Sequence, residues 1–402
     1  MNRSGRTLLA EQRALVSSSR SPLWSKSSSL PVFATRSALY SSQATKTMSG
    51  KSEAPSQNKK PIVFSGIQPT GQPHLGNYLG AISNWVTLQE QAQSADETLL
   101  FSIVDLHAIT LPQDPAKLRK ERMEMATTLL ACGIDPEKCS LFEQSKVPEH
   151  TQLSWILTCM TPVGWLARMT QWKTKLGVTK GAQSLEDVST TAGLQLGLFA
   201  YPVLMAADVL LYKADKIPVG EDQIQHLELA RDIAQSFNHY VKHPYFPSPR
   251  PIITETKRVM SLRDPASKMS KSNPSDQTRI NLVDTPEMIT SKIKRAVTDS
   301  IRGISYDRLE RPAVANLVDI YAAMKRCSVE DIVQEHKDSS NAQFKEALAD
   351  TLITKLRPIQ AELVRLSKEE AYVHSVLDKG AEKAREIAYP NIVEIQKLVG
   401  LR

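Results

Sequence analysis

The chain contains 402 residues, enough for two domains or for one large domain with an appendage. Hydrophobic residues make up 41% and charged residues 23%, as in an ordinary soluble globular protein. No apolar run reaches the roughly 18 residues that span a bilayer, which argues against an integral membrane protein. The formal charge of +7 would suggest a nucleic-acid binder, but residues 1–60 carry ten Lys or Arg and only two acidic residues. The remaining 40 basic and 41 acidic residues sum to −1, so the excess says nothing about the partners of the folded part.

The basic N-terminal segment, residues 1–58, predicts a mitochondrial transit peptide followed by a disordered linker. Its arginines are spaced through a Ser-rich, acid-poor sequence with short apolar patches, a composition typical of organellar transit peptides and not of secretory signals. These arginines are Arg3, Arg6, Arg13, Arg20 and Arg36. The predicted location is therefore the mitochondrial matrix; a disordered tail without a targeting role is the alternative.

Short predicted strands and helices alternate from about Pro61 onward. Strands are expected at 62–65, 99–104, 140–143 and 217–219, and helices from about 76, at 115–132, at 200–212 and at 222–237. This alternation predicts an α/β fold with a Rossmann-like, doubly wound parallel sheet, forming a catalytic domain over 59–279. The polar stretch 177–191, rich in small residues, predicts a surface loop.

Beyond about residue 280 the pattern becomes helical. Helices are expected at 287–297, 313–327, 342–356 and 358–377, so residues 280–402 predict a C-terminal all-helical domain. The cysteines form no C-x-x-C pair, which argues against a zinc site and against a disulfide framework. We expect buried, reduced thiols at Cys132, Cys139, Cys159 and Cys327.

The first motif, IQPTGQPHLGN at 67–77, lies in the turn between the first predicted strand and the first helix. In a doubly wound fold this turn is at the carboxyl end of a strand, where ligands bind. Glycine lets the backbone approach a nucleotide, and the following helix presents free N–H groups to phosphate. His74 and Asn77 are three residues apart, so both side chains can reach one phosphate group. An ordinary Pro/Gly turn with one histidine is the alternative.

The second motif, KMSKS at 268–272, lies in a predicted loop. Lys268 and Lys271 carry two ammonium groups interleaved with hydroxyls, which suits a polyphosphate whose negative charge must be held as it leaves. A solvated Lys/Ser loop is the alternative. Neither motif is decisive alone, but together they are hard to dismiss.

Together the two motifs resemble the HIGH and KMSKS elements of the class I aminoacyl-tRNA synthetases, in the family's order. The resemblance sharpens to the tryptophanyl enzymes of bacterial and organellar type and extends over essentially all of 62–402. It is carried by FSGIQPTG at 64–71, VDLHAIT at 104–110, YPVLMAAD at 201–208, PVGEDQ at 218–223 and AVTDS at 296–300. One departure is a longer link between Lys175 and Tyr201 than in the family's simplest members.

The resemblance implies an ATP site made from three segments. The first supplies Gln68, Pro69, Thr70, Gly76 and Asn77, with His74 in the same turn. The others supply Gly220, Glu221 and Asp222 at the ribose, Val259 at the adenine, and the loop residues Lys268, Met269, Ser270, Lys271 and Ser272. Lys268 and Lys271 would hold the leaving pyrophosphate and, with His74 and Asn77, are the expected catalytic residues.

Asp208 is anomalous even without the resemblance. The predicted helix around it is apolar on nearly all sides, so its carboxylate must be exposed, paired or functional. The resemblance implies that Asp208 accepts the indole N–H of tryptophan, with Tyr201, Met205 and His107 around it. Indole offers one donor and no acceptor, so one carboxylate can distinguish it from a phenyl ring. His107 and His226 could equally be structural histidines.

The activity implied is ATP-dependent activation of L-tryptophan to tryptophanyl-adenylate, followed by transfer to tRNA(Trp). Mg²⁺ would arrive with the phosphates of ATP, and no protein-ligated metal and no membrane partner are expected. The C-terminal helical domain would bind the anticodon. A helical insertion at about 144–200 would form a homodimer interface, with the apolar stretch 153–165 as the candidate surface; plain core packing is the alternative.

Three other functions stay open at this point. A tyrosyl-tRNA synthetase shares the fold and both motifs, but the stretches 104–110 and 205–208 favour tryptophan. A small-metabolite nucleotidyltransferase would leave the KMSKS loop and the helical region without a function. A synthetase-derived organellar RNA-binding or splicing factor would not need the intact set of ATP-site residues.

Overall fold

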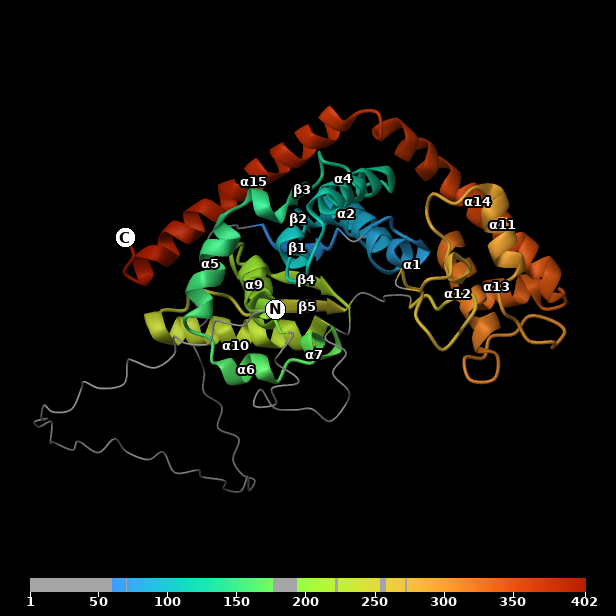
Figure 1. Cartoon of the computed structure of the whole chain (residues 1–402), viewed down its shortest axis with the longest axis horizontal. Helices are drawn as coiled ribbons and strands as arrows, with labels where there is room; N and C mark the ends of the chain where they lie inside the picture. Colours follow the sequence, from blue (N-terminus) through green and yellow to red (C-terminus); the bar gives the residue numbers. More distant parts are fainter. Residues whose placement is uncertain (1–59, 70, 176–193, 221–222, 254–257, 272) are drawn as a thin grey trace, which may run out of the picture. The chain divides into compact units, whose positions relative to one another are not determined.

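The computed structural model describes residues 60–69, 71–175, 194–220, 223–253, 258–271 and 273–402 (Figure 1). Its centre is a parallel sheet of five strands in the order β3-β2-β1-β4-β5. The strands are β1 (Ile62–Ile67), β2 (Thr98–Ile103), β3 (Ser140–Glu143), β4 (Lys216–Val219) and β5 (Arg250–Ile253). The predicted Rossmann-like α/β fold is confirmed, and β5 was not predicted. The predicted transit peptide and the predicted loop at 177–191 lie outside the described residues.

The strands are apolar on both sides because helices cover both faces of the sheet. Val63 and Phe101 belong to one core cluster, whereas Phe64 and Leu100 belong to the other. Successive side chains of a strand point to opposite faces, so a continuous apolar run is buried on both. The core is therefore divided by the sheet into two layers.

The helices of the first half follow the predicted alternation. After β1 come α1 (Leu75–Asn77), the π-helical turn η1 (Tyr78–Ile82) and α2 (Ser83–Ala95) as one continuous segment. The others are α3 (Asp105–Ala108), α4 (Pro115–Ala131), the 3₁₀ turn η2 (Gln144–Lys146), α5 (Glu149–Thr158), α6 (Val163–Ala167), α7 (Gln171–Lys175), α9 (Leu196–Leu210) and α10 (Ile224–Val241). The residues at the start of α4 show why the helix begins there. Asp114 accepts a hydrogen bond from Lys117 N–H at 2.7 Å, and Pro115 occupies the first helical position.

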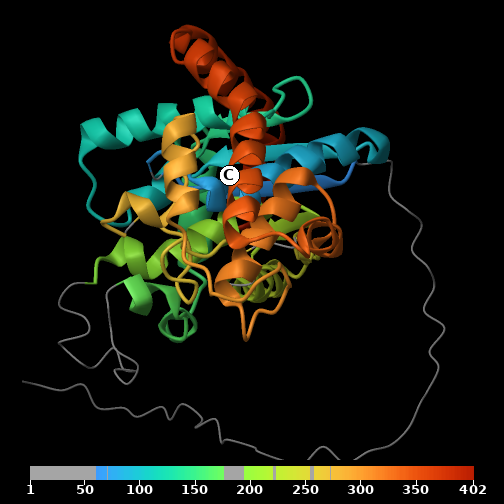
Figure 2. The same ribbon diagram turned by 90° about the vertical axis from the view of Figure 1, so that its right-hand side faces the viewer.

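The C-terminal part is helical, as predicted, but the bounds predicted for its last two helices are wrong, and the helix at 329–336 was not predicted. It comprises η4 (Asp276–Thr278), α11 (Pro286–Lys294), α12 (Pro312–Lys325), α13 (Val329–His336), α14 (Asn341–Leu366) and α15 (Glu370–Leu398). In Figure 2 the side that carries α11 to α14 faces the viewer. Instead of two helices at 342–356 and 358–377, α14 continues through Pro358. Leu356 and Ile359, on either side of this proline, are both buried in the core, so packing offsets the roughly 3 kcal/mol that an interior proline costs.

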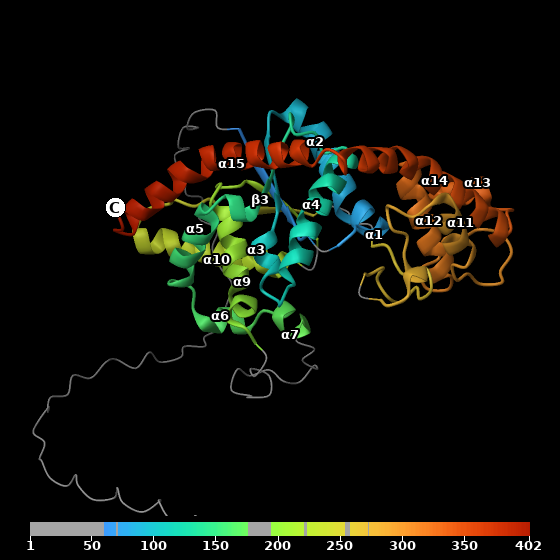
Figure 3. The same ribbon diagram turned by 45° about the horizontal axis from the view of Figure 1, so that its top comes forward.

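The last helix, α15, crosses the edge of the sheet from one core layer to the other. Its first turns place Leu377 in one layer, and its later turns place Ala384 and Ile392 in the other. At the crossing point Gly380 lies against the backbone of β3, where an added Cβ would come within 1.9 Å of the Leu141 carbonyl oxygen. Figures 1 and 3 show α15 running along β3 and toward α5. Glycine is therefore required for this close approach.

All four cysteines are free, as predicted, but their burial differs. Cys132 and Cys139 are buried, and burial raises the pKa of each thiol to about 12. Cys159 is exposed near the end of α5 and Cys327 is half-buried, so the prediction of burial is wrong for these two. Among the described helices, none is both long and apolar enough to cross a membrane.

Candidate functional site

Asp208 lies on α9 and is held by side chains from three other elements. It is 2% exposed, so it is paired and not at an exposed helix edge. His107 Nε2 lies 2.9 Å from its Oδ2, and His150 Nδ1 lies 2.7 Å from its Oδ1. The Gln144 side-chain nitrogen lies 2.7 and 2.9 Å from the two oxygens. Both carboxylate oxygens therefore accept two hydrogen bonds from the protein.

The Asp208 carboxylate is ionised. The Gln144 side-chain oxygen accepts the Leu106 N–H at 3.2 Å, which turns its amide NH₂ toward Asp208 as a donor. Burial alone would raise the pKa of Asp208, but the adjacent His150 and the hydrogen bonds from His107 and His150 outweigh it and lower the pKa to about 2. The protein thus maintains a negatively charged acceptor in its interior, a state that needs charge-assisted donors.

The other residues predicted around Asp208 lie close to it. The Tyr201 hydroxyl forms hydrogen bonds to His226 Nε2 at 2.7 Å and to Gln171 Oε1 at 3.0 Å. The rings of Tyr201 and His107 meet edge-on with their centroids 6.1 Å apart. Met205 is half-buried, one turn before the carboxylate on α9. His226 is fully buried, in contact with the predicted Tyr201.

Gln144 and His150, which contact Asp208 directly, were missed by the sequence analysis. Gln144 follows β3 directly, and side chains at the carboxyl ends of parallel strands commonly line ligand sites, so its position was a usable signal. His150 also contacts Tyr212, with its Nε2 2.8 Å from the hydroxyl. Nothing in the sequence distinguishes His150 from an ordinary helix residue, because its partners Asp208 and Tyr212 lie 58 and 62 positions away.

The predicted phosphate-binding turn follows the end of β1. His74 precedes α1, and its backbone N–H donates to the Asn77 side-chain oxygen at 3.1 Å. The turn is paired with a distant segment: Leu75 N–H donates to the Ile280 carbonyl at 2.8 Å, and Leu282 N–H donates to the Pro73 carbonyl at 3.2 Å. Residues 280–282 therefore bring the segment that follows the KMSKS loop onto the first motif.

His74 is 4% exposed and uncharged. Burial, and then the positive charges of Lys271, Arg279 and Lys268, lower the pKa of His74 to about 4. Its Nδ1 is buried and has no hydrogen-bond partner among the described residues. Gly76 provides the room, since a Cβ there would meet the ring at 2.9 Å. The turn thus presents a neutral imidazole within a positively charged surrounding.

Lys271 of the KMSKS loop reaches the same turn. Its ammonium donates to the Gly71 carbonyl at 2.8 Å, and Gly71 has the positive φ of 60° that favours glycine. Burial lowers the pKa of Lys271 to about 8, although Glu121 opposes the shift. The two sequence motifs, about 200 residues apart, therefore form one site.

The KMSKS loop is anchored by backbone hydrogen bonds at its base. Met269 N–H donates to the Val259 carbonyl at 3.0 Å, and Ser261 N–H donates to the Ser267 carbonyl at 2.8 Å. Val259 and Met269 are buried in the core, whereas Lys268 is exposed and Ser270 half-buried. The loop is thus held in the core by its apolar residue Met269, while the polar residues on either side of it stay accessible.

A buried polar cluster supports the segment that follows this loop. Lys292 of α11 is 1% exposed, and its ammonium lies 2.6 Å from Asp284 and 2.5 Å from Asp276. Asn281 donates to the same two carboxylates at 3.2 and 2.9 Å, and its backbone bridges to His74. The cluster holds residues 276–284, which pair with the first motif. No role was predicted for Lys292.

The remaining predicted ATP-site residues lie at neighbouring strand ends or outside the described residues. Gln68 and Pro69 directly follow β1, and Gly220 directly follows β4; these strands are parallel neighbours in the sheet. Thr70, Glu221, Asp222 and Ser272 lie outside the described residues. Within the described part of the chain, no group of three or more His, Cys, Asp or Glu side chains could hold a metal ion.

The predicted interface stretch divides between core and surface. Leu153 and Leu157 are fully buried in the layer under α9, so part of the stretch is core packing. Trp155 on α5 is 70% exposed and Val163 on α6 is 61% exposed. The predicted contact surface therefore reduces to the exposed part of this stretch.

Comparisons with known proteins show which sequences and solved structures this chain resembles. The family model described as tRNA synthetases class I (W and Y) matches residues 56–357. The chain is 47% identical to the tryptophan–tRNA ligase of Rickettsia conorii over 85% of this chain and 99% of that protein. It is 45% identical to the mitochondrial tryptophan–tRNA ligase of Saccharomyces cerevisiae over 84% and 90%. The solved structure of the Mycoplasma pneumoniae tryptophanyl-tRNA synthetase is similar with a TM-score of 0.73 and 34% identity, over 86% of this chain and 99% of that one.

Proposed function

Because the chain belongs to the class I tryptophanyl-tRNA synthetases, we propose that it activates L-tryptophan with ATP and transfers it to tRNA(Trp) for mitochondrial translation. In the first step the tryptophan carboxylate attacks the α-phosphorus of ATP, so that tryptophanyl-adenylate forms and pyrophosphate leaves. In the second step a ribose hydroxyl at the 3′ end of the tRNA attacks the activated carbonyl, and AMP leaves. The observation that carries the substrate assignment is the ionised, buried carboxylate of Asp208.

Asp208 suits the indole N–H because it offers charge and acceptor capacity in a buried place. Its donors His107, Gln144 and His150 fix its orientation at 2.7–2.9 Å, so little ordering remains when a ligand binds. A site with a buried acceptor discriminates strongly against a ligand that cannot donate to it. Phenylalanine, which has no ring N–H, would therefore be rejected.

The ATP site combines two kinds of group. His74 is neutral and its Nδ1 is unpartnered among the described residues, so the turn can meet a phosphate oxygen without adding a fixed charge. Lys268 and Lys271 supply positive charge toward the departing pyrophosphate, where stabilisation lowers the barrier. Gly76 keeps the imidazole in place by lacking a Cβ. Positioning and charge are what this reaction requires from the protein.

Mg²⁺ enters this proposal only with the substrate. It binds through phosphate oxygens and needs no dedicated protein cage, and it would neutralise charge on the leaving pyrophosphate. The residues available to orient the phosphates are His74, Asn77 and Lys271. The C-terminal helices are proposed to contact the anticodon.

We further propose mitochondrial targeting and a homodimer. Targeting is supported by the Arg- and Ser-rich segment at 1–58 and by the similarity to the yeast mitochondrial enzyme. The dimer is supported by the exposed Trp155 and Val163 on consecutive helices of the insertion at 144–200.

Amino-acid-dependent exchange of pyrophosphate into ATP tests the central proposal. The purified chain should support exchange with tryptophan and not with tyrosine or phenylalanine. Charging of tRNA(Trp) tests the second step. Exchange with tyrosine in preference to tryptophan would identify the alternative tyrosyl enzyme, and no exchange with any amino acid would favour a non-catalytic RNA-binding role.

A further inference from the structure

Most of the support for Asp208 comes from one short segment, residues 144–150. Gln144 at its start donates to both carboxylate oxygens, and His150 at its end contacts Oδ1. The segment consists of the turn η2 and the first residues of α5, directly after β3. Its position therefore determines where the donors of Asp208 lie.

The two ends of this segment are not supported equally from within the catalytic sheet. Near Gln144, Ser145 N–H donates to Asp105 at 2.9 Å, and the Ser145 hydroxyl donates to the same carboxylate at 2.5 Å. At the other end the His150 ring is held by the Tyr212 hydroxyl, 2.8 Å from Nε2, but among the described residues no hydrogen bond from β2 or α4 anchors the chain there. Among the described strands β3 lies at the edge of the sheet and pairs with β2, and α15 packs against it.

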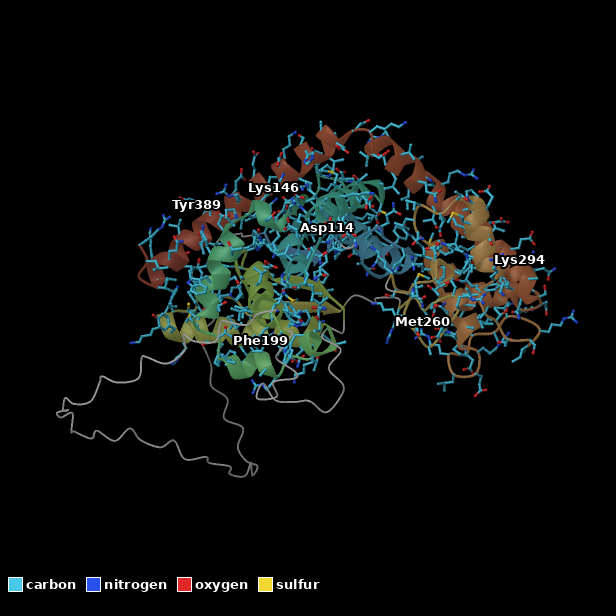
Figure 4. The ribbon with its side chains drawn as sticks, viewed as in Figure 1. Asp114, Lys146, Phe199, Met260, Lys294 and Tyr389 are labelled. Atoms are coloured by element: carbon cyan, nitrogen blue, oxygen red, sulfur yellow. The ribbon has the colours of Figure 1, made fainter. Side chains whose placement is uncertain are left out.

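Helix α15 makes two ion pairs with this segment, one on each side of Gly380. Lys146 pairs with Asp378, and Figure 4 shows Lys146 labelled beside α15. Arg385 donates to Glu149 Oε1 from Nε at 3.2 Å and from Nη2 at 3.0 Å. We call these two pairs the α15 clasp. Gly380 lets the helix lie flat enough on β3 for both pairs to form.

The pair at Glu149 is the more consequential half of the clasp. Glu149 is 2% exposed, precedes His150 directly, and has one oxygen that is buried without a partner among the described residues. Without Arg385 a buried carboxylate beside His150 would lose its only described cationic partner, and because an uncompensated buried charge is strongly unfavourable, Glu149 would move from its present position. Asp378 is more than half exposed, so its pair is worth less.

We propose that Arg385 is a positioning residue for recognition of the amino-acid substrate. It fixes Glu149, and thereby the adjacent His150, against Asp208. This inference rests on the proposed function, since it assigns to α15 a part in selecting the amino acid whose side chain reaches Asp208. It adds a specificity determinant contributed by the C-terminal helices, outside the Rossmann-like sheet.

The test is the Arg385→Gln substitution in the full chain, with KM for tryptophan and for ATP measured by pyrophosphate exchange. We expect the KM for tryptophan to rise by about 2- to 30-fold, the range typical of residues that act through another group, while the KM for ATP is unchanged. Preference for tryptophan over phenylalanine should fall. Arg385→Lys, which keeps the charge, should recover most of the affinity.

Two further variants make the outcome decisive. Arg365→Gln removes an arginine of α14 whose pairs, to Glu362 and Glu369, stay among the C-terminal helices, and it should change neither KM. Glu149→Gln keeps the shape of the buried side chain and should reproduce the same rise in KM for tryptophan, even if Arg385→Gln folds poorly. An equal rise in both KM values, or no rise in Arg385→Gln and Glu149→Gln, would overturn the proposal. Absence of tryptophan-dependent exchange in the wild type would instead reject the proposed function.

Discussion

The Lys271 ammonium donates to the Gly71 carbonyl at 2.8 Å, although the two residues are 200 positions apart. This contact joins the loop of the second motif to the turn of the first. Gly71 takes a positive φ, so its carbonyl points where the ammonium can reach it. The same ammonium lies near His74. A phosphate bound at the proposed site would therefore lie between groups of both motifs.

Lys271→Ala should slow adenylate formation by about 10²- to 10³-fold, by analogy with removal of one oxyanion-stabilising donor. Affinity for tryptophan should change little, because an interaction made mainly with departing pyrophosphate appears in the rate. Single-turnover adenylate formation and tryptophan binding measured on the same variant check this. A normal rate with weakened tryptophan binding would reverse the assignment.

The pH dependence of the wild type gives an independent check on Lys271. Its pKa is lowered to about 8, so the free enzyme loses this positive charge as the pH rises through that value. The kcat/KM for ATP, which reports groups of the free enzyme, should therefore decline above about pH 8. Lys271→Arg keeps its charge and should lack this decline, even if it is slower overall.

Asp208→Ala should lower the efficiency of tryptophan activation by about 10- to 150-fold, the equivalent of one charge-assisted hydrogen bond. The efficiency of phenylalanine activation should change little, so the ratio of the two activation efficiencies, tryptophan over phenylalanine, should fall. Asp208→Asn keeps one acceptor oxygen and should fall in between. Asp232→Ala, an exposed aspartate on α10, is the control and should leave the kinetics alone. Equal losses for tryptophan and phenylalanine would refute the role in specificity.

Lys292→Ala should destabilise the fold by about 3–5 kcal/mol, because it leaves two carboxylates facing each other without their buried cation. The partners are Asp284, which is 1% exposed, and Asp276. Urea unfolding of this variant and of Lys294→Ala, an exposed lysine of the same helix, provides the comparison. Equal stability of the two variants would show that the cluster does not hold residues 276–284.

Trp155→Asp should convert a dimer into a monomer. The indole is 70% exposed on α5, and a charge at the centre of an apolar contact is costly to bury. Light scattering should give twice the chain mass of 44.7 kDa for the wild type and the single-chain mass for the variant. Tyr240→Asp, at an exposed aromatic on α10, is the matched control. A monomeric wild type at micromolar concentration would remove the basis of this prediction.

A chain that starts at Lys59 should fold and exchange pyrophosphate like the full chain, because residues 1–58 have the charge pattern expected of a targeting segment and not of a folded domain. The same segment fused to a fluorescent reporter should direct it to mitochondria, as fluorescence microscopy of living cells would show. Loss of adenylate formation in the shortened chain would contradict the prediction that residues 1–58 are dispensable for catalysis. A reporter that stays in the cytosol would contradict the prediction of targeting.

Local sequence determined the elements and the two motifs. The apolar runs of β1 to β4 and the spacing of α4 predicted strands and helices close to those observed. The residues in the turn at 67–77 and in the loop at 268–272 also predicted a phosphate site, because such a site needs glycine, free N–H groups and cations in a short stretch of chain.

Tertiary structure alone decided what surrounds these residues. The donors Gln144 and His150 reach Asp208 from 64 and 58 positions away, and Arg385 reaches Glu149 across 236. The path of α14 through Pro358 was likewise settled by packing, since local propensity favoured a break there. The physical reason is the same in each case. A buried charge or a helix-breaking residue is unfavourable by itself, and only partners that the fold brings from distant parts of the chain make it stable.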